Sequence, residues 1–128
     1  MSQNVYIVAA KRTPVGKAVR GVFRHTRPDD MLAFAIKETL ATVPQLDPAL
    51  IEDGIFGCAM PEGPQGMNVA RISVLLAGLP DSVPGMTINR FCSSGVQSIA
   101  TAAASMPTGD VPALALAGGV ESMSSVPL

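Results

Sequence analysis

Apolar and polar positions alternate along this chain in two distinct periods. Four short aliphatic runs, each bounded by turn residues, predict buried strands at 5–10, 55–60, 86–90 and 113–117. Between these runs, apolar residues recur at three- and four-residue spacing, which predicts helices that begin near Pro28, Asn68 and Cys92. Strands that alternate with helices favour an α/β fold with a largely parallel, mixed sheet and helices on both of its faces.

The first two predicted helices carry recognisable start signals. Thr26, Pro28 and Asp29 precede an apolar stripe, which consists of Leu32, Ile36, Leu40 and Val43. Asn68 has the side chain of a helix N-cap, and it precedes a second stripe of Val69, Ile72, Leu76 and Leu79. We expect the first helix to be half exposed and to end at Pro44, and Asp47-Pro48 to begin a short helical turn.

The third predicted helix follows a strand directly, and Cys92 lies at their junction. Ser94 and Gln97 have the spacing of a capping box, so the helix is expected to begin at or just after Cys92. No charged residue occurs between Phe91 and Thr108, and the side opposite the apolar stripe consists of small residues. Such a helix is expected to be buried on more than one side.

A helix N-terminus presents unpaired N–H groups, which favour an anion such as a thiolate. The stabilisation is about 0.3–1 kcal/mol, and up to about 2 kcal/mol in a partly buried site, so a nucleophilic thiol still needs a base. From position alone, Cys92 is either an activated thiol or a buried structural cysteine. Cys58 lies within the predicted strand 55–60 and is interpreted as a packing residue.

Composition narrows the class of protein. With 128 residues, 48% hydrophobic residues and a net charge of −1, the chain is globular and is neither disordered nor a nucleic-acid binder by bulk charge. Two cysteines make no disulfide framework, and the run 5–10 is too short for a secretory signal. No apolar stretch approaches the ~20 residues of a membrane span. We therefore expect a cytoplasmic protein without a membrane span.

Basic residues gather in the first predicted loop. Six of the nine Lys and Arg residues lie between positions 11 and 27, at Lys11, Arg12, Lys17, Arg20, Arg24 and Arg27. They form either a solvated or subunit-contacting loop, or a positive rim for an anionic substrate such as a coenzyme A ester. The sequence has no G-x-G-x-x-G, P-loop, C-x-x-C or H-E-x-x-H motif, so no cofactor and no metal are expected.

Four motifs, in order along the chain, resemble the N-terminal signatures of the thiolases. They are Ala-Lys-Arg-Thr-Pro-Val-Gly-Lys at 10–17, Gly-Met-Asn-Val-Ala-Arg at 66–71, Asn-Arg-Phe-Cys-Ser-Ser-Gly at 89–95 and Ala-Gly-Gly-Val-Glu-Ser-Met-Ser at 117–124. Among thiolases, 89–95 and Phe-Arg-His-Thr-Arg-Pro-Asp-Asp at 23–30 are most similar to bacterial 3-ketoacyl-CoA thiolases. Pro112 departs from the acidic residue expected there, which affects only the start of the fourth strand.

The resemblance implies a domain organisation. Residues 1–128 correspond to a thiolase N-terminal domain, an incomplete half that lacks the loop domain and the C-terminal domain. We expect the parent reading frame to continue for roughly 250–280 residues, the length of one or two further domains, with a Gly-His-Pro-type histidine and a Cys-x-Gly-type cysteine. A homodimer or homotetramer is implied, and a β-oxidation multienzyme partner is a further implied association.

The resemblance also implies a reaction. Cys92 is the implied nucleophile for thiolytic cleavage of a 3-ketoacyl-CoA, with coenzyme A as substrate and an acyl-cysteine intermediate. The backbone N–H of this cysteine is implied to help hold the thioester oxyanion. The family takes its base, a histidine, and its proton donor, a second cysteine, from the C-terminal half. His25, on a loop between Arg24 and Arg27, and Cys58 are poor substitutes, so residues 1–128 alone are expected to be inactive.

Three alternatives remain open at this point. The first is a biosynthetic acetyl-CoA C-acetyltransferase, which substrate-chain-length assays would distinguish. The second is a non-catalytic interaction module derived from a thiolase half. The third is a redox-sensing thiol protein, which would oxidise Cys92 reversibly without acyl transfer.

Overall fold

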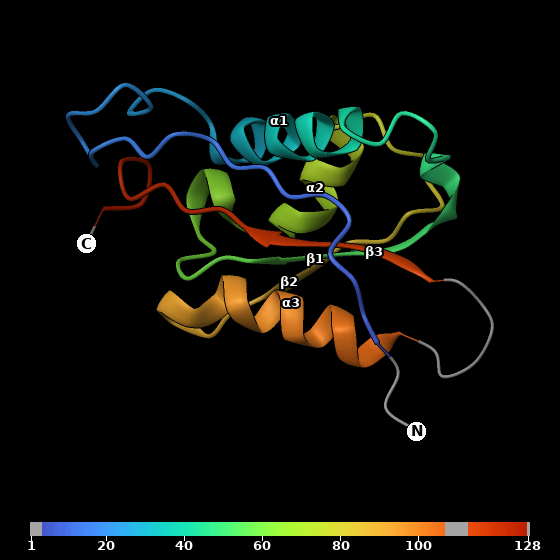
Figure 1. Cartoon of the computed structure of the whole chain (residues 1–128). Helices are drawn as coiled ribbons and strands as arrows, with labels where there is room; N and C mark the ends of the chain where they lie inside the picture. The colour runs from blue at the N-terminus through green and yellow to red at the C-terminus, as the bar shows by residue number, and fades with distance from the viewer. Residues whose placement is uncertain (1–3, 107–112, 128) are drawn as a thin grey trace.

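The computed structural model describes residues 4–106 and 113–127. In this part of the chain, three parallel strands form a sheet in the order β2-β1-β3. The helices α1 and α2 cover one face of the sheet, and α3 covers the other (Figure 1). This is an open α/β half, as expected. The strands are β1 Ile51–Gly57, β2 Met86–Ile88 and β3 Leu114–Gly119, and the helices are α1 Pro28–Ala41, α2 Val69–Leu76 and α3 Ser94–Ser105, with 3-10 turns η1 Pro48–Leu50, η2 Gly63–Gln65 and η3 Phe91–Ser93.

The register of the sheet brings the three strand ends to one edge. Gly57, the last residue of β1, pairs with Ile88 of β2 and with Gly119 of β3. The strands are parallel, so the loops that follow them all emerge at this carboxyl edge. The segments around Cys58, Cys92 and Glu121 therefore come together there, although they are far apart in the sequence.

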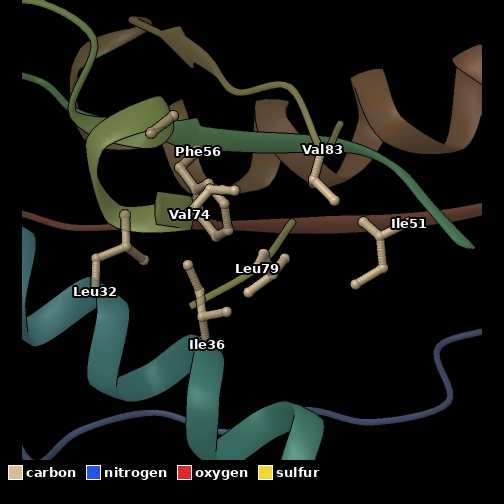
Figure 2. Close-up of a cluster of buried hydrophobic side chains, with 8 residues drawn as sticks. Leu32, Ile36, Ile51, Phe56, Val74, Leu79 and Val83 are labelled. Atoms are coloured by element: carbon tan, nitrogen blue, oxygen red, sulfur yellow. The ribbon is translucent and has the colours of Figure 1, made fainter. Parts of the chain in front are cut away.

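The main hydrophobic core lies between the sheet and the helices α1 and α2. Figure 2 shows Leu32 and Ile36 of α1 directed toward Phe56 of β1 and Val74 of α2. Most of the core side chains are aliphatic, and Leu32 and Ile36 lie on the predicted buried side of α1. The other buried members of this cluster are Ile51, Ala70, Leu79 and Val83.

The predicted first strand at 5–10 is wrong. These residues form no strand in the structure, and Figure 1 draws them as a coil. Tyr6 is 76% exposed and Val8 is 71% exposed. A strand needs a neighbouring strand's backbone groups, and none of the described strands pairs with this segment. Instead, a groove of about 630 Å³ lies among this segment, α3 and β3.

Two predicted strand boundaries also change, at β1 and β2. The strand β1 begins at Ile51 rather than Ile55. Its first half contains polar residues and an irregularity in the register between Ile51 and Asp53, so it does not form the aliphatic run from which the strand was predicted. It ends at Gly57, so Cys58 follows the strand rather than lying inside it. The strand β2 ends at Ile88 rather than Arg90.

The last strand, β3, continues through Gly118 and Gly119, two residues beyond the predicted end at Ala117. Gly118 pairs with Phe56 and Gly119 pairs with Gly57. A Cβ on Gly118 would lie 3.4 Å from the Phe56 ring, which is an ordinary van der Waals contact. Pro107 and Gly109 are expected from the sequence to stop the third helix; these two residues and Pro112 lie outside the described residues.

The helix starts confirm one cap and contradict another. Asn68 accepts a hydrogen bond from Arg71 N at 3.2 Å, as an N-cap should. The predicted capping box of α3 is wrong, since its N-cap, Ser93, makes no side-chain cap bond. Ser94 Oγ instead accepts from Arg90 N at 2.8 Å, and Gln97 Oε1 accepts from Arg90 Nη1 at 2.6 Å.

The buried face of α3 is its small-residue face. Ser94, Ser98 and Ala102 are buried, whereas Val96 is 73% exposed and Ile99 is 46% exposed. Ser98 Oγ donates to the Gly118 carbonyl at 2.7 Å, which requires a close approach of the helix to β3. The prediction that α3 is buried on more than one side is therefore wrong for this chain taken by itself. Among the described helices, none is long and apolar enough to cross a membrane.

Candidate active site

The candidate site lies at the carboxyl edge of the sheet. Cys58 directly follows β1, Cys92 lies four residues after β2, and Glu121 lies two residues after β3. Backbone hydrogen bonds join the segments: Cys58 N donates to Ile88 O at 3.0 Å, and Val120 N donates to Gly57 O at 3.0 Å. In open α/β sheets, ligands bind outside the carboxyl ends of the strands, so this edge is where chemistry is expected.

Cys92 lies in the turn between β2 and α3. It is exposed, and it occupies the middle of the 3-10 turn η3, one residue before the α3 N-cap. The strand-to-helix placement predicted for Cys92 is therefore confirmed, and the short 3-10 turn between the two elements is new. An exposed sulfur at this position is accessible to a substrate approaching the edge of the sheet.

Phe91, immediately before Cys92, has a backbone conformation that L residues rarely adopt. Its φ is 48°, in the left-handed region. A non-glycine residue in such a region costs on the order of 1–3 kcal/mol and persists only where its surroundings hold it. Asn89 supplies one such restraint, because its Oδ1 accepts a hydrogen bond from Phe91 N at 2.8 Å. The Cys92 turn is therefore strained and held in place.

Asn89 is a residue that the sequence reasoning missed. Besides accepting from Phe91 N, it donates through Nδ2 to the Ala59 carbonyl at 3.1 Å, which ties the Cys92 turn to the loop after β1. The signal was present in the sequence, since an asparagine two residues before a turn position forms an Asx turn. The link to Ala59 depends on tertiary structure alone.

Glu121 was likewise quoted only as part of a motif. Its carboxylate accepts from Ala59 N at 2.7 Å, from Met60 N at 3.3 Å and from Gln65 Nε2 at 2.5 Å. Gln65 is completely buried; its Nε2 also donates to Met60 O at 2.7 Å, and its Oε1 accepts from Ser122 N at 2.9 Å. Glu121 and Gln65 thus fix the loop that follows β1 against the loop that follows β3.

Cys58 has the surroundings of a packing residue. Its relative exposure is 1%. Burial, and then the nearby Glu121 carboxylate, raise the pKa of the Cys58 thiol to about 11, and its sulfur lies 3.9 Å from Glu121 Oε1. This thiol stays protonated near neutral pH and is a poor nucleophile there.

His25 is not brought to Cys92. It lies exposed on the loop before α1, and the described residues show no hydrogen bond between the side chains of His25 and Cys92. The basic loop around it contributes Lys11, Arg12 and Lys17 to a cavity of about 460 Å³, which it shares with residues 119–124 and with α1. Cys92 does not line this cavity. Arg27 instead pairs with Asp29 at 2.8 Å at the start of α1.

No metal cluster is present in the described part of the chain, where no three His, Cys, Asp or Glu side chains are grouped to hold an ion. Throughout the described part of the chain, every buried side-chain nitrogen and oxygen atom has a hydrogen-bond partner.

Comparison with known families decides the classification. The family model described as "Thiolase, N-terminal domain" matches residues 5–128. This chain belongs to the thiolase family. The chain is 52% identical over 122 residues to a 3-ketoacyl-CoA thiolase of Bacillus subtilis (strain 168), covering 95% of this chain and 31% of that protein.

Two further relatives agree. A 3-ketoacyl-CoA thiolase of Vibrio vulnificus (strain YJ016) is 45% identical over 126 residues, which is 98% of this chain and 32% of that protein. A beta-ketoadipyl-CoA thiolase of Pseudomonas knackmussii is 45% identical over 127 residues, 99% of this chain and 31% of that protein. The chain described here spans about a third of the length of the curated relatives it matches. The resemblance noted in the four motifs is thereby confirmed.

Proposed function

We propose that the whole protein containing this chain is an acyltransferase that cleaves a 3-ketoacyl-CoA with free coenzyme A, with Cys92 as its nucleophile. The observation that carries the proposal is the exposed thiol of Cys92 in a strand-to-helix turn at the carboxyl edge of the sheet. The relatives named 3-ketoacyl-CoA thiolase support the choice of substrate class.

The proposed reaction has two halves. The Cys92 thiolate attacks the 3-keto carbon, the bond between C2 and C3 breaks, and the electron pair leaves on the enolate of acetyl-CoA, which takes up a proton. The shortened acyl group remains on sulfur as a thioester. The thiolate of free coenzyme A then attacks this thioester and releases shortened acyl-CoA and the Cys92 thiolate. Both acyl carriers are thioesters, so the exchange is readily reversible.

The backbone N–H of Cys92 is proposed as an oxyanion donor. Cys92 is the second residue of η3, and the first N–H groups of a helix have no partner within it. In the proposed mechanism this N–H holds the negative oxygen of a thioester during attack. The geometry of the turn therefore serves both the sulfur and the oxyanion.

The base and the proton donor are proposed to come from residues outside this chain. His25 is exposed on the loop before α1, and Cys58 is buried with a raised pKa, so neither suits the role. The relatives are about three times as long, which leaves ample chain for these groups. The exposed apolar side chains of Val96 and Ile99 on α3 suggest where such a segment packs.

Several finer features belong to the same proposal. The basic loop 11–27 is proposed as a positive rim for the coenzyme A ester, with a solvated or subunit-contacting loop as the alternative. A cytoplasmic homodimer or homotetramer in fatty-acid β-oxidation, without a cofactor, fits the family.

The experiment is to assay the complete protein with 3-ketoacyl-CoA substrates of several chain lengths and to trap the acyl enzyme in wild type and Cys92→Ser.

The outcomes separate the candidate functions. Cleavage of longer substrates with an acyl group trapped on Cys92 supports the proposal. Activity confined to acetoacetyl-CoA favours a biosynthetic acetyl-CoA C-acetyltransferase. Absence of turnover together with reversible oxidation of Cys92 favours a redox thiol. Absence of both favours a non-catalytic interaction module.

A further inference from the structure

A continuous set of hydrogen bonds runs from the loop after β3 to the Cys92 turn. Glu121 accepts from Ala59 N at 2.7 Å. The Ala59 carbonyl, on the same residue, accepts from Asn89 Nδ2 at 3.1 Å. Asn89 Oδ1 in turn accepts from Phe91 N at 2.8 Å, one residue before Cys92. The first step joins the loops after β3 and β1, the second joins the loops after β1 and β2, and the third lies within the loop after β2.

The Glu121 end of this set is fixed by buried structure. Gln65 is completely buried, and it bridges Glu121 Oε1, Met60 O and Ser122 N. Two backbone N–H groups, those of Ala59 and Met60, also point at the Glu121 carboxylate. The position of Ala59 is therefore determined by the loop after β3 rather than by the strand β1 alone.

The Asn89 end holds a conformation that is unfavourable by itself. Phe91 has φ 48°, and without a restraint a phenylalanine leaves this region for the more stable extended or right-handed helical ones. Because Cys92 is the next residue, rotation at Phe91 moves the sulfur relative to the start of α3. A misplacement of about 1 Å at a reacting group costs on the order of 10²-fold in rate.

We propose that Asn89 is a positioning residue for the Cys92 nucleophile, and that Glu121 acts on the same turn through the backbone of Ala59. The proposal rests on the function proposed above and deepens it. Asn89 restrains the peptide before Cys92, and Glu121 restrains the carbonyl on which Asn89 is anchored. Neither side chain touches the reacting atoms in this arrangement.

The test uses the complete protein and three variants, Asn89→Ala, Glu121→Gln and the double variant. Asn89→Ala removes both hydrogen bonds of the amide, and Glu121→Gln leaves one carbonyl oxygen for the three nitrogen donors now on Glu121. The matched control is Asp47→Ala. Asp47 Oδ1 accepts from Ala49 N at 3.0 Å in the same two-residue geometry, but at the amino end of β1, away from Cys92.

Two quantities are measured on each protein: kcat and KM for thiolysis, and the rate at which iodoacetamide alkylates Cys92. We expect Asn89→Ala to lower kcat by about 10- to 100-fold with KM changed less than about twofold, since the nucleophile and not the substrate site is displaced. The alkylation rate of Cys92 is expected to change by about fivefold, because release of the turn alters the exposure and the surroundings of the sulfur. Asp47→Ala is expected to match wild type in both.

The action of Glu121 through Ala59 and Asn89, here called the relay, is tested by a double-variant cycle. If Glu121 acts through Asn89, the double variant loses little more activity than Asn89→Ala alone. Losses that multiply independently overturn the relay, and wild-type kcat and alkylation in Asn89→Ala overturn the positioning role. Should Asn89→Ala fail to fold, Glu121→Gln decides, because wild-type values for both measurements in that variant contradict the proposal.

The alkylation arm separates this inference from the proposed function. It needs no acyl-CoA substrate, so a complete protein without thiolysis but with Asn89-dependent alkylation would contradict the proposed function and support the positioning role. Thiolysis by wild type, with kcat and alkylation unchanged in the variants, would support the proposed function and contradict the positioning role.

Discussion

Gly57 and Ser94 approach so closely that neither β1 nor α3 leaves room for another atom between them. A Cβ on Gly57 would lie 2.6 Å from Ser94 Cβ and 2.5 Å from its carbonyl carbon. The N-terminus of α3 therefore rests directly on the last residue of β1. This contact sets the distance between the sheet and the helix that begins two residues after Cys92.

The first prediction follows from this contact. Gly57→Ala should destabilise the complete protein by about 1–3 kcal/mol, because the new methyl group overlaps backbone atoms of α3 that cannot move alone. The measurement is the free energy of unfolding in denaturant. Gly95→Ala is the control, since outside its own helix turn no atom lies within 4 Å of an added Cβ, and it should be neutral or stabilising by up to about 1 kcal/mol. Equal effects of the two substitutions would contradict the close-contact explanation.

The second prediction concerns the two thiols. Iodoacetamide near neutral pH should modify the exposed Cys92 first and abolish acyl transfer, while Cys58 reacts only on unfolding. Peptide mapping after limited alkylation makes the measurement. Cys58→Ala serves as the control, because it should leave the labelling of Cys92 unchanged. Preferential labelling of Cys58 would show that the assignment is wrong.

The third prediction is a pH dependence from Cys58. The pKa of this thiol is raised to about 11 in the folded state from an ordinary value of 9.0, so the folded protein holds its proton more tightly than the unfolded chain. The resulting stabilisation is fully present below about pH 9 and is lost as the pH rises toward 11. Unfolding midpoints measured between these values should fall more steeply for wild type than for Cys58→Ala. Parallel curves would exclude Cys58 as the cause.

The fourth prediction concerns the buried amide of Gln65. Gln65→Leu should cost about 2–4 kcal/mol in the free energy of unfolding, because Met60 O, Ser122 N and Glu121 each lose a partner in a buried site. The exposed Gln45 provides the matched control, and Gln45→Leu should change stability by less than about 0.5 kcal/mol. A small cost at position 65 would mean that solvent replaces these hydrogen bonds.

The fifth prediction is that residues 1–128 alone turn over no 3-ketoacyl-CoA at a useful rate. The helix N-terminus contributes at most about 2 kcal/mol to thiolate stability. Loss of a base, a proton donor and substrate positioning removes factors of roughly 10²-fold or more each. Thiolysis by the purified segment is compared with that of the complete protein. A segment about as active as the complete protein would refute the proposal that the base lies outside this chain.

The sequence by itself determined the α/β class, the three helices and the place of Cys92. These features depend on local signals: a 3.6-residue apolar period, the Asn68 cap, and an aliphatic strand that passes into a helix at Cys92. The motif order also pointed to the thiolases, which the match over residues 5–128 confirmed. Local patterns act within a few residues, so they can be recognised in the chain alone.

Tertiary structure decided what depends on partners distant in sequence. An apolar run at 5–10 indicated burial, but a strand needs a neighbour, and none of the described strands pairs with it. The face of α3 that packs on the sheet was settled by the close approach at Gly57 rather than by hydrophobicity, so Ser98 is buried and Val96 is exposed. Asn89 and Glu121 are joined through Ala59 only because three parallel strands end at one edge.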